Sequence, residues 1–248
     1  LASSEAVLSF EEKEAGVALI DIGGGTTDLA IFKDGIIRHT AVIPFGGNVI
    51  TEDIKEGCSI IEKQAELLKI KFGSAWPGEN RDTEIVSIPG LQGRDPKEIS
   101  LKTLSKIINA RVVEIIEQVF LEIKNYGHND QKKKLIAGVV LTGGGSQLKH
   151  LKQLVEYITG MDTRVGYPSE HLAGDTTEAV SSPLFATSVG LLMSALDEMP
   201  TAVPSDESTA LDIEASKNED QSSKEVNRQR KSILDRFGEK LKEFLDNA

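Results

Sequence analysis

Two glycine-rich segments carry the residue types from which phosphate-binding sites are built. Residues 21–28 read Asp-Ile-Gly-Gly-Gly-Thr-Thr-Asp, and residues 141–147 read Leu-Thr-Gly-Gly-Gly-Ser-Gln. Consecutive glycines let backbone N–H groups approach a phosphate without interference from a Cβ atom. Each segment also follows an apolar run typical of a buried strand. We therefore predict that both loops bind a phosphorylated ligand, the alternative being two ordinary glycine turns.

Two aspartates, Asp21 and Asp28, bracket the first loop. Carboxylates repel a polyphosphate unless a cation lies between them, and Mg²⁺ binds one or two carboxylates while it keeps several waters. Thr26 and Thr27 add hydroxyl groups that can donate to phosphate oxygens. The second loop is expected to run into a helix from about residue 147, whose N-terminal dipole favours negative charge. The pattern predicts a magnesium–phosphate site.

Signatures of other chemistries are missing from the sequence. It has no Walker A motif, no dinucleotide-binding G-x-G-x-x-G and no G-x-S-x-G.

Glu66 and Lys69 stand three residues apart on a predicted helix, and this spacing alone favours a weak, solvent-exposed ion pair. The histidines lack the spacing of metal ligands and are assigned no chemistry: His39, His128, His150 and His171.

Strand-like and helix-like patterns are mixed along the chain, which predicts an α/β fold. Residues 17–22 form an apolar run next to a glycine, and Asp34-Gly35 between two strand-like runs indicates a tight hairpin over residues 29–42. Apolar residues at helical spacing predict a long helix over residues 101–126. The other expected strands are 84–88, 138–141 and 163–167, and the other expected helices are 49–58, 60–72, one from 147, and 184–196.

Composition narrows the function classes. The 248 residues include 28 Lys and Arg against 39 Asp and Glu, a net charge of −11, which disfavours a nucleic-acid partner. The single cysteine, Cys58, excludes an internal disulfide and is expected to pack as a small apolar residue. No signal peptide and no membrane-spanning run are recognised. Because the sequence starts at Leu1, we expect it to be the C-terminal part of a longer protein.

The last fifty residues divide into an acidic linker and an amphipathic segment. Residues 197–227 hold nine acidic and two basic residues and few large apolar ones, which predicts a disordered, flexible linker over 197–230. Over 231–248, six large apolar side chains fall on one helical stripe. This stripe is typical of a helix that binds an anionic membrane surface, the alternative being a helix that docks on the body or on a partner. The six are Ile233, Leu234, Phe237, Leu241, Phe244 and Leu245.

With these segments in view, the sequence resembles a known family. The first loop is similar to the second phosphate loop of the actin, sugar-kinase and heat-shock-chaperone ATPase superfamily, and the second loop to its adenosine loop. Within that superfamily the chain resembles FtsA, the actin-like bacterial cell-division family. The segments that carry this resemblance are residues 39–54, 65–75, 138–151 and 182–192.

The resemblance implies ATP and Mg²⁺ as cofactors, with hydrolysis that is slow at most. Asp21 and Asp28 would position Mg²⁺ and water, and Glu66 and Lys69 would reach the ribose, in place of an exposed pair. The residues that would cradle the β- and γ-phosphates are Gly23, Gly24, Gly25, Thr26 and Thr27. Those that would lie behind the adenine and α-phosphate are Gly143, Gly144, Gly145 and Ser146.

The resemblance also implies an organisation and a set of partners. The expected parts are the end of a first-half domain (1–15), subdomain 2A (16–48 and 109–196), subdomain 2B (49–108), the linker (197–230) and a membrane-targeting helix (231–248). The expected partners are FtsZ through subdomain 2B, further copies in actin-like filaments, and the cytoplasmic face of the bacterial inner membrane at the division site. The alternatives are a kinase or a pilus-assembly scaffold of the same superfamily.

Overall fold

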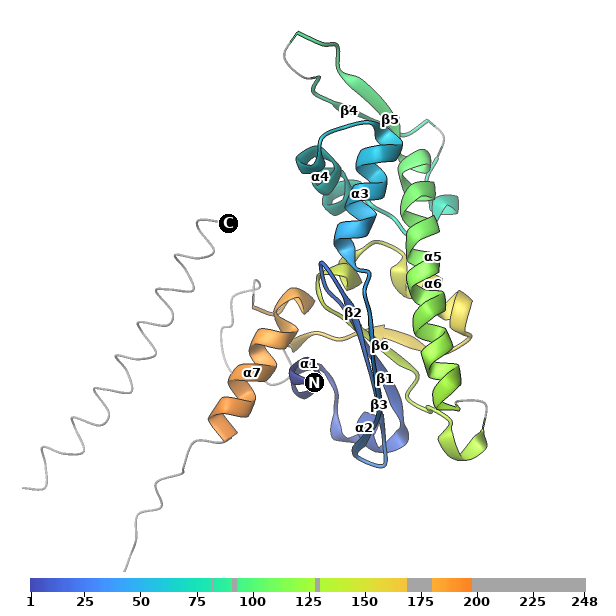
Figure 1. Ribbon diagram of the computed structural model, residues 1–248, viewed down its shortest axis with the longest axis vertical. Coiled ribbons are helices and arrows are strands. Elements are labelled where there is room, and N and C mark those ends of the chain that lie inside the picture. Colours follow the sequence, from blue (N-terminus) through green and yellow to red (C-terminus); the bar gives the residue numbers. More distant parts are fainter. Residues whose placement is uncertain (82, 91–92, 128–129, 169–179, 198–248) are drawn as a thin grey trace, which may run out of the picture. The chain divides into compact units, whose positions relative to one another are not determined.

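A five-stranded sheet with the order β3-β2-β1-β6-β7 lies between helices in the unit formed by residues 1–200 (Figure 1). The computed structural model describes residues 1–81, 83–90, 93–127, 130–168 and 180–197. Strand β1 (Val17–Ile22) runs antiparallel to β2 (Thr27–Lys33), and β2 runs antiparallel to β3 (Ile36–Ile43). Strand β6 (Val139–Thr142) is parallel to β1, and β7 (Thr163–Val165) is parallel to β6. The predicted α/β class is confirmed.

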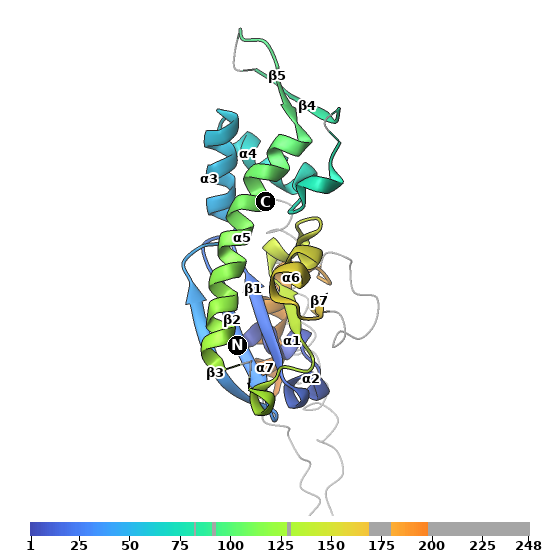
Figure 2. The ribbon, with the colours of Figure 1, turned by 90° about the vertical axis from the view of Figure 1, so that its right-hand side faces the viewer.

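Helices cover both faces of this sheet (Figures 1 and 2). Ala18, Ile20 and Leu141 belong to one core, together with buried residues of α3, α4, α5 and α6. Val17 and Leu19, on the opposite face, pack in a second core with α1 and α7. The alternation of neighbouring residues follows from the two-residue period of a strand. The helices are α1 (Ala2–Val7), α2 (Phe10–Ala15), α3 (Gly47–Cys58), α4 (Glu62–Phe72), α5 (Leu101–Tyr126), α6 (Leu151–Thr159) and α7 (Ala186–Asp197).

Helices α3 and α4 pack against the first part of α5 beyond the end of the sheet, where a small hairpin adjoins them, and the rest of α5 runs beside the sheet (Figure 1). Arg111 of α5 donates two hydrogen bonds to the carboxylate of Asp53 on α3, at 2.6 and 3.0 Å. Cys58, at the end of α3, is buried among apolar residues, as the sequence predicted. The hairpin pairs β4 (Ile85–Ile88) with β5 (Lys97–Ser100).

Four elements differ from the sequence-based predictions. Strand β5 was missed because only Ile99 of its four residues is buried. Helices α1 and α2 were also missed, although Ser9 and Glu12 form the capping box that starts α2. The prediction that a helix starts at about residue 147 was wrong. The second loop continues into the 3₁₀ turn Gly144–Gln147, and α6 begins only at Leu151, because Lys149 first pairs with Ser74 in a short bridge.

The expected linker (197–230, apart from Asp197, the last residue of α7) and the expected membrane-targeting helix (231–248) lie outside the described residues, as do His128 and His171. Among the helices that are described, none is both long enough and apolar enough to cross a membrane.

Candidate functional site

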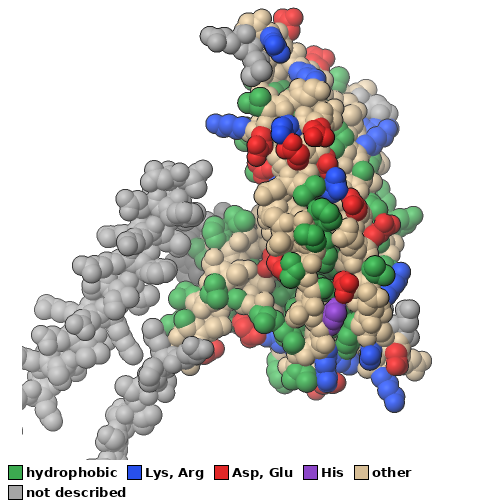
Figure 3. Space-filling model, in the orientation of Figure 1, with side chains coloured by type: hydrophobic (Ala, Val, Ile, Leu, Met, Phe, Trp, Pro, Cys, Tyr) green, Lys and Arg blue, Asp and Glu red, His purple; other side chains and the backbone are tan. Residues whose placement is uncertain are grey.

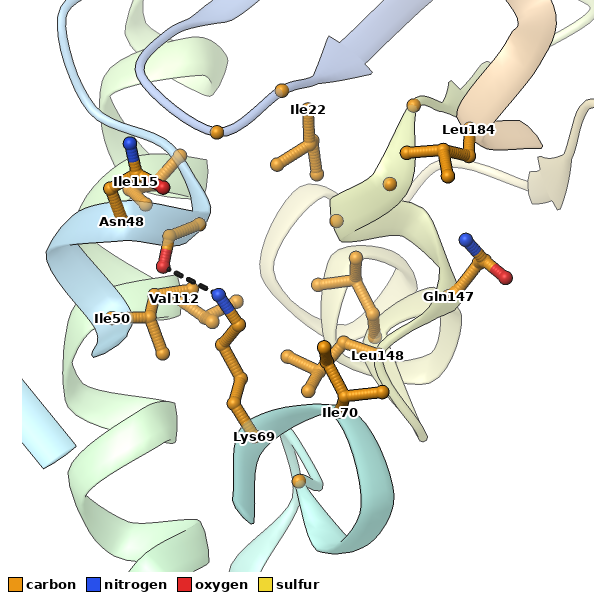
Figure 4. Close-up of a pocket in the computed structure, with 18 of the residues that line it drawn as sticks. Ile22, Asn48, Ile50, Lys69, Ile70, Val112, Ile115, Gln147, Leu148 and Leu184 are labelled. Atoms are coloured by element: carbon orange, nitrogen blue, oxygen red, sulfur yellow. Dashed lines mark hydrogen bonds between the residues drawn. The ribbon is translucent and has the colours of Figure 1, made fainter. Parts of the chain in front are cut away.

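A cavity of about 640 Å³ opens at the end of the sheet where both glycine loops emerge (Figure 4). Strands β1 and β6 are parallel neighbours, with Asp21 opposite Thr142, so their carboxyl ends deliver the two loops to the same edge. Helices α3, α4 and α5 supply the opposing walls. The structure brings eight of the predicted site residues to the lining: Asp21, Gly23, Gly24, Glu66, Lys69, Gly143, Gly144 and Gly145.

The two glycine loops touch each other. A Cβ atom on Gly143 would lie 2.6 Å from the carbonyl oxygen of Ile22 and would collide with Oδ1 of Asp21. Gly143 also has φ +80°, a region that residues with a Cβ rarely adopt. A Cβ on Gly145 would collide with the side chain of Ile22. Glycine is therefore required at both positions by the close approach of the loops.

The start of α3 is hydrogen-bonded to the backbone of the first glycine loop. The N–H groups of Gly47 and Asn48 donate to the carbonyl oxygens of Gly23 and Gly24, at 2.9 and 2.8 Å. Gly46 makes this approach possible, because a Cβ there would lie 2.6 Å from the Gly23 oxygen. The loop's carbonyl groups are thus turned toward α3.

Several loop N–H groups are left for a ligand. Within the described part of the chain, the N–H groups of Gly24, Gly25, Gly144 and Gly145 have no hydrogen-bond acceptor. Successive unpaired N–H groups on two facing loops form the kind of donor set that binds phosphate. The observed loops therefore fit a phosphorylated ligand.

The Glu66–Lys69 pair belongs to the cavity wall. Nζ of Lys69 lies 2.7 Å from Oε2 of Glu66 and donates to Oγ1 of Thr51 at 2.7 Å and to the carbonyl oxygen of Gly47 at 2.9 Å. Thr51 also donates to Glu66. Burial acts to raise the pKa of Glu66, but the hydrogen bonds from Lys69 and Thr51 outweigh it, and the pKa is lowered. The side chain of Lys69 is only 15% exposed, so the spacing-based expectation of an exposed pair was wrong for the lysine.

Asp21 and Asp28 are direct cross-strand partners in the β1–β2 pair. Residues opposite each other on antiparallel strands point to the same side of the sheet, so the two side chains lie on the same side of the β1–β2 pair. Thr187 donates to Oδ2 of Asp21 at 3.1 Å, and Thr26 donates to Asp28 at 3.2 Å. No cluster of three acidic, histidine or cysteine side chains occurs in the described ranges. Mg²⁺ held by two carboxylates, phosphate oxygens and waters needs no such cluster.

Five predicted site residues do not line the cavity: Gly25, Thr26, Thr27, Asp28 and Ser146. The hydroxyl of Thr27 is buried and donates to the carbonyl oxygen of Phe45 at 2.8 Å. The hydroxyl of Ser146 donates to the carbonyl oxygen of Gly143 at 2.8 Å. These two hydroxyls therefore hold the loops in shape and are already engaged.

Sequence reasoning missed other lining residues. Asn48 follows Gly46-Gly47 directly, and this third glycine-rich turn was the signal that could have identified it. Gln147 is the last residue of the second glycine-rich segment and also lines the cavity (Figure 4). No local pattern distinguishes Ile70, Leu184 or Thr187, which reach the cavity only through the packing of their helices.

Comparisons with known proteins agree with this geometry. The family model described as "Cell division protein FtsA" matches residues 18–190. Cell division protein FtsA of Neisseria meningitidis is 42% identical over 195 residues, which cover 79% of this chain and 46% of that protein. The chain thus spans about half the length of the curated relatives it matches.

Solved structures show the same fold at low sequence identity. MreB5 of Spiroplasma citri bound to AMPPNP is 21% identical with a TM-score of 0.63, covering 79% of this chain and 58% of that one. A PilM–PilN type IV pilus biogenesis complex contains a chain that is 20% identical with a TM-score of 0.60, covering 79% of this chain and 51% of that one. The fold is therefore that of the actin-like ATPases.

Proposed function

The chain belongs to the family of cell division protein FtsA, and from this premise we propose that it is part of an actin-like protein that binds ATP and anchors the FtsZ ring to the cytoplasmic face of the bacterial inner membrane. The observation that carries the ATP-binding part of this proposal is the cavity between the two glycine loops, with unpaired N–H groups on both and an acidic residue beside them. Its volume of about 640 Å³ suits a ligand the size of a nucleotide.

Each wall of the cavity suits one part of ATP. The loop Gly23–Gly25 would hold the terminal phosphates through its N–H groups, and Gly143–Gly145 would lie behind the α-phosphate and the adenine. Glu66 accepts hydrogen bonds in the wall between α3 and α4, as a partner of ribose hydroxyls must. The apolar side chains of Ile70, Leu148 and Leu184 offer surface to the base (Figure 4).

Asp21 and Asp28 are the residues that would act on Mg²⁺. The ion would neutralise charge between these carboxylates and the phosphates and supply a Lewis acid for phosphate chemistry. Asp21 would be held in place for this role by its neighbours in β1 and by Thr187. We propose that hydrolysis is slow, because ATP that binds only the closed form stabilises that form without turnover.

Calorimetry with Mg-ATP tests the nucleotide site. Asp21→Asn removes one charge at the cavity and should weaken Mg-ATP binding at least tenfold. Asp34→Asn is the matched control, because it removes the same charge from an exposed turn at the far end of β2, and its affinity should equal that of the wild type. Gly144→Val should also weaken binding, because Gly144 lines the cavity and the valine adds bulk there. The fold should tolerate the change, since a Cβ at this position meets only the end of the Leu184 side chain. Equal affinities for all three variants would contradict the proposal.

A phosphate-release assay separates this function from a kinase of the same fold. Turnover above about 1 per second, at the low end of ordinary enzymes, would favour a catalytic role. Turnover well below that rate is the expected result.

We propose that the amphipathic segment 231–248 is the membrane anchor, on the basis of its sequence. Burying six large apolar side chains contributes several kcal/mol, at about 1.5–3 kcal/mol for each one fully buried, but interfacial burial is partial. One such helix binds weakly, so filaments of many copies would gain avidity. Phe237→Glu with Phe244→Glu should abolish flotation with anionic liposomes, while Glu239→Gln on the polar side should not. Flotation of the double variant would favour the docking alternative.

The FtsZ contact is proposed to lie in residues 49–108, which include most of α3, all of α4, the β4–β5 hairpin and the start of α5. The family relation supports this assignment. A single substitution tests this assignment. Ile85 of the hairpin is 56% exposed, so Ile85→Lys should leave the fold intact. It should weaken co-sedimentation with FtsZ. Unchanged co-sedimentation would argue for a contact elsewhere in this segment.

A further inference from the structure

Thr187 and Asp21 lie 166 residues apart in the sequence and meet at the edge of the cavity. Thr187 is the second residue of α7, and its hydroxyl donates to Oδ2 of Asp21 at 3.1 Å. A hydroxyl has one proton to donate, so this contact uses the whole donor capacity of Thr187. This bond links a side chain of α7 directly to the first glycine loop.

The position of Thr187 is set by the packing of α7 and not by Asp21. Ala186 and Val189 on either side are buried in the second core. Gly190 faces α1 so closely that a Cβ there would collide with the carbonyl oxygen of Ala2. Helix α7 is thus fixed along one side, while hydrophobic side chains remain exposed along its length (Figure 3). A side chain held by a rigid element is suited to orient another group.

The carboxylate of Asp21 is confined from a second direction. Its Oδ1 occupies the space that a Cβ on Gly143 would need, so the second glycine loop lies directly against it. The segment before α7 touches the same loop, with Cδ1 of Leu184 3.0 Å from the position of a Cβ on Gly144. Residues 184–187 therefore contact both glycine loops. Leu184 lies against the second loop, and Thr187 donates a hydrogen bond to Asp21 of the first loop.

We propose that Thr187 is a positioning residue that holds the Asp21 carboxylate in the orientation required by a magnesium-bound nucleotide, an inference that rests on the proposed nucleotide site. Without the hydroxyl, Oδ2 of Asp21 loses the hydrogen bond that orients the carboxylate. The loss should then affect binding that depends on Mg²⁺ and leave binding of the metal-free nucleotide nearly unchanged.

The test compares ATP affinity with Mg²⁺ and with EDTA in the full chain. Thr187→Val keeps the shape of the side chain and removes the donor. It should weaken Mg-ATP binding about five- to tenfold, less than the full effect of a hydrogen bond to a charged group, because this contact is exposed to solvent. Binding of ATP in EDTA should change less than about twofold. Thr187→Ser keeps the hydroxyl and should restore wild-type affinity. Ser188→Ala removes a hydroxyl from the next, exposed residue of α7 and serves as the control.

The outcomes separate the inference from the function on which it rests. Wild-type Mg-ATP affinity in Thr187→Val would overturn the inference alone. An equal loss with and without Mg²⁺ would also overturn it, because it would show a general packing role. A full-length wild-type protein that binds ATP under neither condition would refute the proposed nucleotide site. Urea unfolding of each variant checks the fold, and because Thr187 is exposed we expect the same midpoint in all of them.

Discussion

Replacement of Lys69 by methionine tests whether the wall between α3 and α4 is held by that lysine. Its Nζ contacts Glu66, Thr51 and Gly47 within 2.9 Å, and its side chain is 15% exposed. Methionine keeps the apolar stem but loses all three contacts. Hydrogen bonds to charged groups contribute about 1.5–3 kcal/mol each. Glu66 is 42% exposed and regains water, so we expect a net loss of about 2 kcal/mol in the free energy of unfolding.

This loss corresponds to a fall in Tm of about 4–8 °C for a unit of this size, measured by circular dichroism at neutral pH. Lys71→Met is the matched control, because Lys71 is exposed on the same helix, and its Tm should change by less than about 1 °C. Mg-ATP affinity should fall in the first variant and not in the second. Equal Tm values for the two variants would show that the network is no stronger than a surface ion pair, and the reasoning would be refuted.

Two further changes probe the loops and the N-terminal segment. Gly143→Ala should lower the free energy of unfolding, measured by urea titration, by about 3 kcal/mol or more, because of strain at φ +80° and the clash with Ile22. Gly25→Ala is the control. A Cβ on Gly25 has open space around it, so its free energy of unfolding should be within about 0.5 kcal/mol of wild type. Burial acts to raise the pKa of Glu12, but hydrogen bonds from Arg164 and from the backbone of Ser9 outweigh it, and the pKa is lowered from its ordinary value. The charged carboxylate of Glu12 therefore stabilises the folded state at neutral pH. This stabilisation is lost as the pH falls through the lowered pKa. Glu12→Gln should therefore cost about 1–2 kcal/mol at pH 7 and progressively less in acid.

Local patterns were sufficient for most of the elements in the sheet. The apolar run of β1 and the turn at Asp34-Gly35 predicted the first hairpins, and both turn residues have positive φ, as a tight hairpin requires. The helical spacing of apolar residues gave both ends of α5. These features are readable because burial on one face of an element imposes a fixed period on its own sequence. Strand β5, with one buried residue, has no such period and was missed.

The site depended on the tertiary structure in a different way. The sequence by itself showed two glycine loops, each after a buried strand, and so the kind of ligand they suit. Only the parallel pairing of β1 with β6 decided that the loops meet at one edge, and only their contact made Gly143 and Gly145 obligatory. The burial of Lys69 and the reach of Thr187 to Asp21 were likewise invisible, since spacing along a helix defines which residues share a face but not what that face packs against.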